Sequence, residues 1–583
     1  MSESESRIRS SLRLFALLNS VSHRGKPDAG AVIGRVMAER PDLRGQSTII
    51  RKLLDEVVRE VQSLSLDQQA EILRTQYPGA LEGESNRRRE ISKRDSKRVI
   101  SLPPLPGAIE GLVSTRFPPE PNGYMHIGHA KAAFIGSEYA KLYGGKFIVR
   151  FDDTNPAAEK LEYYGAFLDA LSWLDVKPDL VKNASDDINI FYHLAEKMIS
   201  DSKAYVCTCA KETMKLMRGE GRACVHRTQE VNKNLALWSA MKDSTVEKGE
   251  AVLRFVGDMT SPNTAMRDPV LFRIVEEPHP IQGKKYRVWP TYDFDGPVED
   301  SLDGVTHAMR SKEYELRDEL YNSILNAMGL RQPRIIEFSR LALQNTTVSK
   351  RSLRRLIEEG KVEGWDDPRL PTISGLRRRG FLPESIKEFI LSMGLSKVES
   401  EPSWDLLESF NRKNLDPFAR RYFFVPNPVK LTVRGAPKIE VSLKFHPEKD
   451  FGSRSIRTDG KFLIPRLDVN DMKEKDSFRL IEAYNVQIEE KRSDEIVGVY
   501  KQETSLAPLA KVQWTSLEES EPLSVKIPGP LLLDGEFNPK SLNVLSGVGE
   551  RSTEEIQIGT VVQFVRFGFC RMDEKGMAIL AHR

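Results

Sequence analysis

The sequence predicts a multidomain α/β protein, and three observations lead to that prediction. The chain has 583 residues, enough for about three to five domains at roughly 100–200 residues each. Strand and helix patterns alternate between residues 111 and 151, as they do where a parallel sheet carries crossover helices. From about residue 415 onward, short alternating runs separated by Pro and Gly predict an all-β half built from barrels.

Composition narrows the class of protein. Hydrophobic residues make up 39% of the chain and charged residues 29%, which is typical of a folded globular protein. The 87 basic and 84 acidic residues give a net charge of +3, so a nucleic-acid face would have to come from local clustering. We see no membrane span and no signal peptide, which predicts a cytoplasmic protein without a membrane partner. Four cysteines argue against a disulfide framework.

Residues 1–86 are predicted to form a helical bundle. Apolar residues recur there at helical spacing in two runs, which are Ile8, Leu12, Phe15 and Leu18, and Ile50, Leu54, Val57 and Val61. Residues 87–107 follow as a linker that is first basic and then rich in proline. A solvated linker is the favoured interpretation of the basic run at residues 87–98, with contact to RNA as the alternative.

A strand at residues 111–117, a helix at 127–143 and a strand at 146–151 make a βαβ unit, which implies a parallel sheet with a right-handed crossover. In the C-terminal half, alternating runs at 429–433, 439–445 and 561–571 predict three strands.

The segment at residues 115–129 is the most informative. A strand ends there in a Pro-rich turn, and a helix begins near His126. The first turn of a helix offers free N–H groups to a phosphate. His126 and His129 lie on one helix face and can donate hydrogen bonds to a phosphate in the transition state, while Gly128 lets a nucleotide approach the backbone. A bare His-x-x-His pattern more often caps a buried turn, so the context has to decide.

With its flanking Pro-Pro-Glu-Pro-Asn-Gly-Tyr, this segment resembles the "HIGH" signature of class I aminoacyl-tRNA synthetases, and specifically their glutamyl/glutaminyl branch. The resemblance implies a Rossmann-type catalytic domain whose helix binds ATP, with Mg²⁺ accompanying the nucleotide. The implied ATP-binding residues in this segment, besides the two histidines, are Pro119, Glu120, Asn122, Gly128 and Lys131.

Residues 347–351 resemble the mobile "KMSKS" loop of the same enzymes, with Thr347 in place of the first lysine. Ser349 and Lys350 match, and a flexible ammonium is suited to following charge onto a leaving pyrophosphate. His126, His129 and Lys350 are therefore the predicted catalytic residues. The resemblance also implies nucleotide contacts from Arg340 and Leu341.

Four residues are predicted to bind the amino acid. Asp152 follows a strand at its carboxyl end, where open α/β sheets bind ligands, and would hold the substrate ammonium. Tyr292 matches a tyrosine that contacts the substrate in the family. Arg310 falls where glutamyl enzymes place an arginine and glutaminyl enzymes an uncharged residue, and Arg116 matches a second arginine near the substrate carboxylate. Because glutamate and glutamine are nearly isosteric, this charge predicts L-glutamate as the substrate.

Cys207 and Cys209 are followed, after fourteen intervening residues, by Cys224 and His226. Three thiolates and one imidazole fit a closed, structural Zn²⁺ site. Three free cysteines are the alternative, although some glutamyl enzymes have a similar site in the insert that meets the acceptor stem. Cys570 is expected in the core.

The basic run Arg377, Arg378 and Arg379 is predicted to bind RNA phosphates, with a solvated surface as an equal alternative. The all-β half resembles the anticodon-binding barrels of the archaeal and eukaryotic enzymes. The resemblance thus implies a catalytic domain at 108–204 and 289–335, an acceptor-stem-binding insert at 205–288, a helical stem-contact domain with the Lys350 loop at 336–410, and a β-barrel anticodon-binding domain at 411–583.

The resulting prediction is a glutamyl enzyme that acts as a monomer on tRNA(Glu). Whether tRNA(Gln) is a second substrate stays open, because the anticodon contacts cannot be located. Two alternatives remain, a glutaminyl enzyme and a tRNA-binding paralogue without catalysis. Arg310 speaks against the first, and the intact His126, His129 and Lys350 speak against the second.

Overall fold

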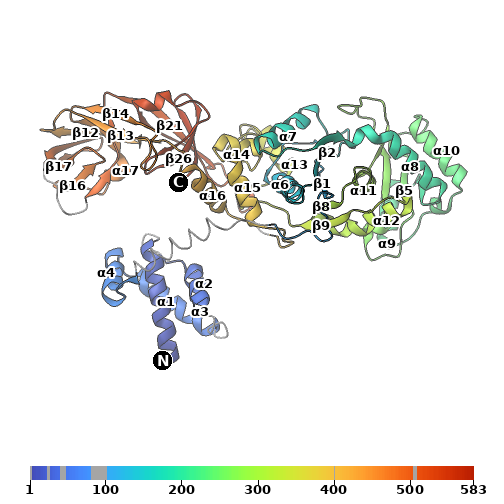
Figure 1. Ribbon diagram of the computed structural model, residues 1–583, viewed down its shortest axis with the longest axis horizontal. Helices are drawn as coiled ribbons and strands as arrows, with labels where there is room; N and C mark the ends of the chain where they lie inside the picture. Colours follow the sequence, from blue (N-terminus) through green and yellow to red (C-terminus); the bar gives the residue numbers. More distant parts are fainter. Residues whose placement is uncertain (1–2, 23–26, 40–46, 81–101, 400, 503–508) are drawn as a thin grey trace. The chain divides into compact units, whose positions relative to one another are not determined.

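The structure is a computed structural model that describes residues 3–22, 27–39, 47–80, 102–399, 401–502 and 509–583 (Figure 1). The chain divides into two compact units, Met1–Ile100 and Ser101–Arg583. The predicted basic run at residues 87–98 lies outside the described residues. No helix in the described part of the chain is long and apolar enough to cross a membrane.

The first unit is helical. Its helices are α1 (Glu3–Ser22), α2 (Ala29–Glu39), α3 (Ser47–Gln62) and α4 (Leu66–Gln76). All eight apolar residues predicted from helical spacing are buried in its core. Arg13 Nε, on α1, lies 2.7 Å from Glu60 Oε1 on α3. Ser65 and Gln68 form a capping box that fixes the start of α4.

The second unit is built around a parallel sheet. β1 (Ser114–Phe117), β2 (Lys146–Phe151) and β3 (Leu180–Asn183) pair in parallel, as do β8 (His307–Ser311) and β9 (Arg334–Phe338). The amide of Thr306 donates to the carbonyl of Ser114 over 2.9 Å, which places β8 beside β1. The strand order is therefore β3-β2-β1-β8-β9, and it reverses between β1 and β8, where open α/β sheets bind ligands.

Helices join these strands. They are α6 (Ile127–Leu142), α7 (Leu161–Trp173), α8 (Ile188–Ser200), α11 (Tyr292–Leu302) and α12 (Asp318–Met328). The predicted βαβ unit is confirmed, with α6 ending one residue early and β2 at the predicted bounds. β1 is shorter than predicted because residues 111–113 form a turn, in which Gly111 has a φ of 76°.

An antiparallel sheet of four strands interrupts the parallel one. Its order is β4 (Ala204–Cys207), β5 (Val252–Phe255), β6 (Val270–Ile274) and β7 (Val288–Pro290), accompanied by α9 (Lys211–Glu220) and α10 (Val231–Lys242). Its core contains Trp238, Phe272 and Trp289, all buried. This sheet occupies the segment predicted as an insert.

Four helices precede the β-rich half: α13 (Lys350–Glu358), α14 (Ile373–Arg379), α15 (Pro383–Ser392) and α16 (Trp404–Leu415). Two backbone bonds attach the start of α14 to the start of α6. The amide of Ile127 donates to Pro371 over 2.9 Å, and the amide of Ile373 donates to Met125 over 2.8 Å. The beginning of α6 is thus held from outside the parallel sheet.

The C-terminal half contains two seven-stranded sheets, one ordered β10-β25-β26-β27-β21-β24-β11 and the other β19-β16-β17-β18-β12-β15-β20. Their strands are β10 (Arg421–Tyr422), β11 (Phe424–Pro426), β12 (Pro428–Arg434), β15 (Lys461–Pro465), β16 (Ser477–Leu480), β17 (Asn485–Lys491), β18 (Glu495–Lys501), β19 (Ala510–Val512), β20 (Thr515–Ser516), β21 (Ser520–Pro528), β24 (Leu542–Glu550), β25 (Val561–Phe564), β26 (Gly568–Glu574) and β27 (Met577–His582). Two hairpins stand apart from these sheets, β13 (Ile439–Lys444) with β14 (Ser453–Thr458), and β22 (Leu532–Leu533) with β23 (Glu536–Phe537).

The strand predicted at residues 561–571 is wrong as a single element. The structure has a hairpin there, in which β25 and β26 pair in an antiparallel arrangement. Arg566 and Gly568 have φ values of 60° and 153°, which reverse the chain between the two strands. The alternating pattern continues across the turn, so it does not reveal the reversal.

Candidate active site and metal centre

A cavity of about 560 Å³ lies at the carboxyl ends of β1, β2 and β8, against the start of α6. Twelve of the fifteen residues predicted to bind ATP or the amino acid line it. They are Arg116, Pro119, Glu120, His126, Gly128, His129, Asp152, Tyr292, Arg310, Arg340, Leu341 and Lys350. Residues more than 200 positions apart in the sequence therefore share one cavity at the switch point of the sheet.

His126 and His129 stack at the start of α6, with ring centroids 3.7 Å apart. His126 Nδ1 accepts from the amide of Gly128 over 3.1 Å, and His129 Nδ1 accepts from the amide of His126 over 3.3 Å. Because each Nδ1 accepts a hydrogen bond, each Nε2 carries the proton of a neutral ring. The pair therefore presents two Nε2–H donors.

Both rings stay neutral at physiological pH. Burial lowers the pKa of His126 to about 3, and the nearby Lys350 and Arg340 add to the effect. Burial also lowers the pKa of His129 well below its usual value, with His126 as the second cause. Neutral Nε2–H donors can bind a phosphate oxygen without taking a proton from it.

The predicted phosphate contact from the first amides of the helix does not fit the structure. The amide of Ile127 donates to Pro371, and that of Gly128 donates to the His126 ring, so both are already used. Gly128, which lines the cavity, also has a packing reason to be glycine. A Cβ there would lie 3.0 Å from His126 Cε1 and 3.2 Å from the carbonyl oxygen of Leu341.

Lys350 reaches the cavity from the first turn of α13. Its Nζ donates to Asn122 Oδ1, and burial lowers the pKa of its ammonium. Ser349 is the N-cap of α13 rather than a cavity residue. Thr347, which replaces the family's lysine, accepts a hydrogen bond from the amide of Ser349 over 3.1 Å. Asn122 and Ser349 thus position Lys350 and do not line the cavity.

Lys131 is placed differently from the prediction. It is 2% exposed and does not line the cavity. Its Nζ donates to the carbonyl oxygen of Ser339 over 2.7 Å and to Ser339 Oγ over 3.1 Å. Burial lowers its pKa to about 8. The lysine therefore joins α6 to the end of β9, directly before the cavity residues Arg340 and Leu341.

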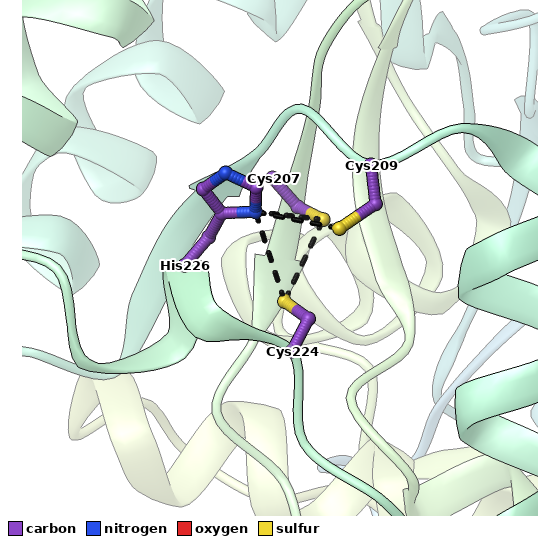
Figure 2. Close-up of side chains that lie close together, drawn as sticks. All are labelled: Cys207, Cys209, Cys224 and His226. Atoms are coloured by element: carbon purple, nitrogen blue, oxygen red, sulfur yellow. Dashed lines mark hydrogen bonds between the residues drawn. The ribbon is translucent and has the colours of Figure 1, made fainter.

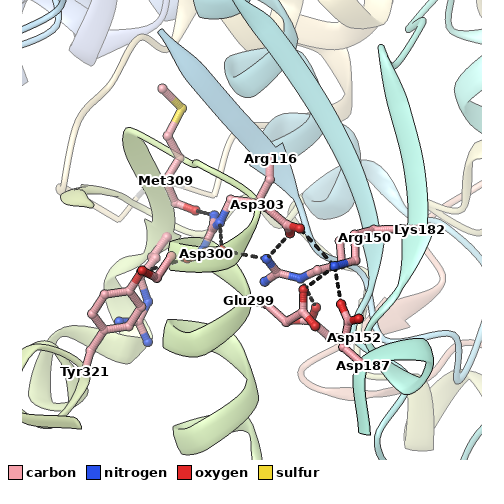
Figure 3. A network of polar contacts seen from close by, with 12 residues as sticks. Arg116, Arg150, Asp152, Lys182, Asp187, Glu299, Asp300, Asp303, Met309 and Tyr321 are labelled. Carbon is pink, nitrogen blue, oxygen red and sulfur yellow. Dashed lines mark hydrogen bonds and ion pairs between the residues drawn. The ribbon is translucent and has the colours of Figure 1, made fainter. Parts of the chain in front are cut away.

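A buried carboxylate that sequence reasoning missed organises the floor of the cavity (Figure 3). Asp300 Oδ1 lies 2.9 Å from Arg116 Nε and 2.8 Å from Arg150 Nη1, and Tyr321 donates to Asp300 Oδ2 over 2.9 Å. Burial acts to raise the pKa of Asp300, but the two guanidinium groups outweigh it and hold the pKa at about 2. Asp300 is charged and fixes both arginines.

Arg150 in turn orients Asp152. Its Nε lies 2.7 Å from Asp152 Oδ1. The other oxygen, Asp152 Oδ2, is buried and has no hydrogen-bond partner. A buried acceptor without a partner costs free energy. Because Asp152 lines the cavity, that oxygen is suited to a cationic ligand group.

Arg310, like Asp152, has a polar atom that is not used in a hydrogen bond. Its Nη1 lies 3.0 Å from Asp318 Oδ1, and its Nη2 donates to the Tyr292 hydroxyl over 3.4 Å. Its Nε–H is buried without a partner. The guanidinium is 5.3 Å from the ring centroid of Tyr314 and 5.1 Å from that of Tyr321, which hold it in place. A donor left unpaired in such a cavity favours a carboxylate ligand.

Sequence reasoning also missed His279, a buried histidine that contacts the loop following β2. His279 Nδ1 accepts from the amides of Ile281 and Gln282, so its proton is on Nε2. Nε2 lies 3.0 Å from the carbonyl oxygen of Asp153 and 3.1 Å from Glu159 Oε2. A residue of the segment between β6 and β7 therefore holds the loop that carries Asp152.

The four predicted metal ligands meet at the end of β4 (Figure 2), and they are the one cluster in the described residues suited to hold a metal ion. Cys207 Sγ lies 3.7 Å from Cys224 Sγ, and His226 Nδ1 lies 3.8, 3.4 and 4.0 Å from the sulfurs of Cys207, Cys209 and Cys224. A tetrahedron with Zn–S of about 2.3 Å and Zn–N of about 2.0 Å has edges of roughly 3.5–3.8 Å. The geometry therefore fits zinc.

The surroundings of this cluster suit deprotonated sulfurs. Arg254 Nη1 points at Cys207 Sγ over 3.8 Å and at Cys224 Sγ over 3.7 Å, and Arg254 is 1% exposed. On the other side of the ring, His226 Nε2 lies 3.0 Å from Thr208 Oγ1. A hydrogen bond there fixes the orientation of the ring and leaves Nδ1 as the ligand atom.

The structure places two residues of the basic run on α14 in contacts within the protein. Arg378 lies 2.8 Å from Asp573 and 2.8 Å from Glu363, and Arg379 lies 2.7 Å from Glu408 and donates to the carbonyl of Ala581. These two arginines attach α14 to β26, β27 and α16. Of the three, Arg377 alone is half-exposed, with a 3.4 Å contact to Asp169.

Three protein-family models match the chain. The catalytic domain of "tRNA synthetases class I (E and Q)" matches residues 112–417, and two anticodon-binding domains of the same enzymes match 419–504 and 511–573. These last two matches cover most of the two seven-stranded sheets, with β27 beyond the second match. The fold class predicted from the sequence is thereby confirmed.

Full-length relatives agree with these matches. The chain is 43% identical to a glutamate–tRNA ligase of Nitrosopumilus maritimus, over 99% of both chains. It is 41% identical to the enzymes of that name from Cenarchaeum symbiosum and Pyrococcus abyssi, over 98% of each chain. With the cavity at the switch point of its parallel sheet and the matched anticodon-binding domains, the chain belongs to the class I tRNA synthetases of the glutamate and glutamine type.

Proposed function

We propose that the chain is a glutamate–tRNA ligase. It activates L-glutamate with ATP, releases pyrophosphate and transfers the glutamyl group to the 3′ end of tRNA(Glu). Relatives that carry this name are 41–43% identical over almost the whole chain. The cavity supplies groups for each part of this reaction.

The observation that carries the choice of glutamate is the buried, unpaired Nε–H of Arg310. Glutamate and glutamine differ little in shape, so the site has to separate them by charge. A side-chain carboxylate satisfies the free donor and the guanidinium charge, whereas an amide presents N–H groups to a cation. Leaving a buried charge of this kind without its partner costs about 2–5 kcal/mol.

The rest of the amino acid is held by residues around Arg310. Asp152 accepts from the α-ammonium through its free Oδ2, while Arg150 fixes its other oxygen. Tyr292 closes one side of the pocket through its contact with Arg310. Arg116, held by Asp300, adds positive charge near the substrate carboxylate.

Activation needs no covalent enzyme intermediate. The α-carboxylate of glutamate attacks the α-phosphorus of ATP in line, and the bond to the β-phosphate oxygen breaks, giving glutamyl-adenylate and pyrophosphate. The Nε2–H groups of His126 and His129 donate to phosphate oxygens as charge develops, and Lys350 follows that charge. Mg²⁺ bound to the phosphates of ATP would neutralise part of their charge.

We propose a structural Zn²⁺ bound by Cys207, Cys209, Cys224 and His226. The ion would join the end of β4 to the turn at residues 224–226 and so fix one edge of the insert. Purified protein should contain about one zinc per chain, and Cys209→Ser should lose most of it. Full folding and zinc-free protein in the wild type would refute this part of the proposal.

The matched anticodon-binding domains support tRNA as the second substrate. Acylation of tRNA(Gln) as well is the wider form of this proposal, and charging assays with both tRNAs separate the two forms. A cytoplasmic monomer is the state we propose, because aminoacylated tRNA is consumed there by the ribosome.

The test of the proposed function is tRNA-dependent ATP–pyrophosphate exchange with glutamate and with glutamine. We expect exchange with glutamate only. Exchange with glutamine alone would make the chain a glutaminyl enzyme. No exchange with either amino acid, from folded protein with tRNA present, would favour a tRNA-binding paralogue.

A further inference from the structure

The cavity contains a second buried carboxylate that the proposed reaction has not used. Asp295 lines the cavity, is 1% exposed, and lies three residues after Tyr292 in the first turn of α11. Its Oδ2 accepts a hydrogen bond from Thr154 Oγ1. Its Oδ1 is buried without a partner, as is Oδ2 of Asp152 in the same cavity.

We infer that Asp295 is a second acceptor for the α-ammonium of the amino acid, and so a specificity-determining residue. This inference rests on the proposed function, because it deepens the binding of the amino acid. An ammonium has three N–H donors. Asp152 Oδ2 and Asp295 Oδ1 offer two acceptors that no group of the described residues satisfies.

The two carboxylates are held by one short segment. Asp152 and Thr154 are two residues apart at the end of β2, and Thr154 Oγ1 binds Asp295. The carbonyl oxygen of Thr154 accepts from Arg273 Nη2 over 3.2 Å, and Arg273 Nη1 donates to the carbonyl oxygen of Pro290. Asp295 is therefore fixed relative to Asp152 by the fold and needs no ligand to place it.

The charges around Asp295 leave room for a cation. The groups that face it are Asp152, Arg150, Arg273 and the Thr154 hydroxyl. Arg150 Nε is used by Asp152 and its Nη1 by Asp300 and Asp303, while its Nη2 is buried with no hydrogen-bond partner among the described residues. Two nitrogens of Arg273 are used by backbone carbonyls. Burial, and next the charge of Asp152, raise the pKa of Asp295 to about 8. Two buried carboxylates are costly together without a cation between them.

An α-ammonium supplies that cation. Its binding lets Asp295 ionise, so the proton that Asp295 holds in the empty site passes to the solvent. A dicarboxylic acid without the amino group cannot do this, because it brings no positive charge to the pair. The site would thus select α-amino acids through two carboxylates.

The test compares two stable mimics of the adenylate, the sulfamoyl-adenosine derivatives of glutamic acid and of glutaric acid, which differ only in the α-amino group. Their dissociation constants are measured with the full chain and with Asp295→Asn, which keeps the shape and an acceptor for Thr154. We expect the variant to bind the glutamic mimic at least about tenfold more weakly and the glutaric mimic within about twofold of the wild type.

Equal weakening of both mimics would show a merely structural role for Asp295, and no weakening of either would also overturn the inference. A second measurement uses the wild type alone. Titration calorimetry at pH 7 in buffers of different ionisation enthalpy should show net proton release with the glutamic mimic and none with the glutaric mimic. The same proton balance for both would overturn the inference. A wild type that binds neither mimic would refute the proposed function itself, and the inference with it.

Discussion

Arg310 in the cavity and two arginines on α14 differ in how they use their N–H donors. In the cavity, Arg310 pairs with Asp318 and the Tyr292 hydroxyl but leaves its buried Nε–H without a partner. On α14, Arg378 directs Nε and both Nη nitrogens to carboxylates, and Arg379 is used by Glu408 and a backbone carbonyl. Both groups were predicted to bind ligands. An unpaired donor on an arginine that lines a cavity therefore marks a binding site better than the presence of an arginine does.

Substitution of a paired arginine on α14 is expected to lower the free energy of unfolding more than it affects substrate binding. Arg379→Ala leaves Glu408, whose side chain is 15% exposed, without its partner, and removing one partner of a buried ion pair costs up to about 3–5 kcal/mol. Urea unfolding should show this loss in the unit formed by Ser101–Arg583. Glutamate KM should stay within about twofold of the wild type. A variant that is as stable as the wild type but binds tRNA more weakly would show that Arg379 contacts the RNA.

Substitution of Arg310 in the cavity is expected to weaken glutamate binding more than it affects stability. Arg310→Gln removes the charge that faces the glutamate carboxylate, so the KM for glutamate should rise roughly 30-fold to several thousand-fold, the equivalent of about 2–5 kcal/mol. The KM for ATP should change by less than about threefold. Both constants are measured in the exchange assay. An unchanged KM for glutamate would show that Arg310 does not contact the bound glutamate.

The two regions should also differ in their response to acid. His126 has a folded pKa of about 3 against an ordinary value near 6.5, so the unfolded chain takes up a proton that the folded chain refuses. The unfolding free energy should therefore fall as pH drops from about 6.5, by about 1.4 kcal/mol per pH unit for this histidine. The guanidinium groups on α14 stay charged throughout and contribute no slope.

Urea unfolding of the wild type and His126→Gln between pH 6.5 and 4.5 checks this. The variant should show a smaller slope by about 1.4 kcal/mol per pH unit. Equal slopes would mean that folding does not lower the pKa of His126, which would contradict the effect of burial assigned to this ring.

The smallest effect is expected at Arg377, the half-exposed member of the α14 run. Arg377→Ala should change the unfolding free energy by less than about 0.5 kcal/mol, because its contact with Asp169 is exposed. If it meets tRNA, the salt dependence of tRNA binding should lose about one unit of slope. An unchanged slope of the salt dependence would show that Arg377 does not contact the RNA. None of the three arginines would then be an RNA contact.

Much of the fold could be predicted because it depends on local patterns. The βαβ unit around His126 and the buried faces of α1 and α3 follow from spacing within a few turns. The hairpin at β25 and β26 could not, because the alternation continues across its turn. Likewise, Arg378 finds Asp573 at a distance of 195 residues in the sequence, and no local pattern reports such a partner.

The same limit applies to the site. His126, Asp152 and Arg310 could be found because they stand in long motifs at the ends of strands. Asp295 and Asp300 could not be found in this way, because a carboxylate inside a helix usually faces solvent. Asp300 is the residue that holds Arg116 and Arg150. Lys131 shows the opposite error, since its place two residues after His129 suggests a ligand contact, whereas its ammonium binds Ser339.

The most direct test measures glutamate KM and unfolding free energy together in two matched variants, Arg310→Gln and Arg378→Gln. We expect Arg310→Gln to raise the KM at least about 30-fold and to change stability less than Arg378→Gln does. We expect Arg378→Gln to leave the KM within about twofold and to lower the unfolding free energy by about 1–3 kcal/mol. A raised KM in Arg378→Gln together with an unchanged KM in Arg310→Gln would contradict the claim that unpaired donors mark the site.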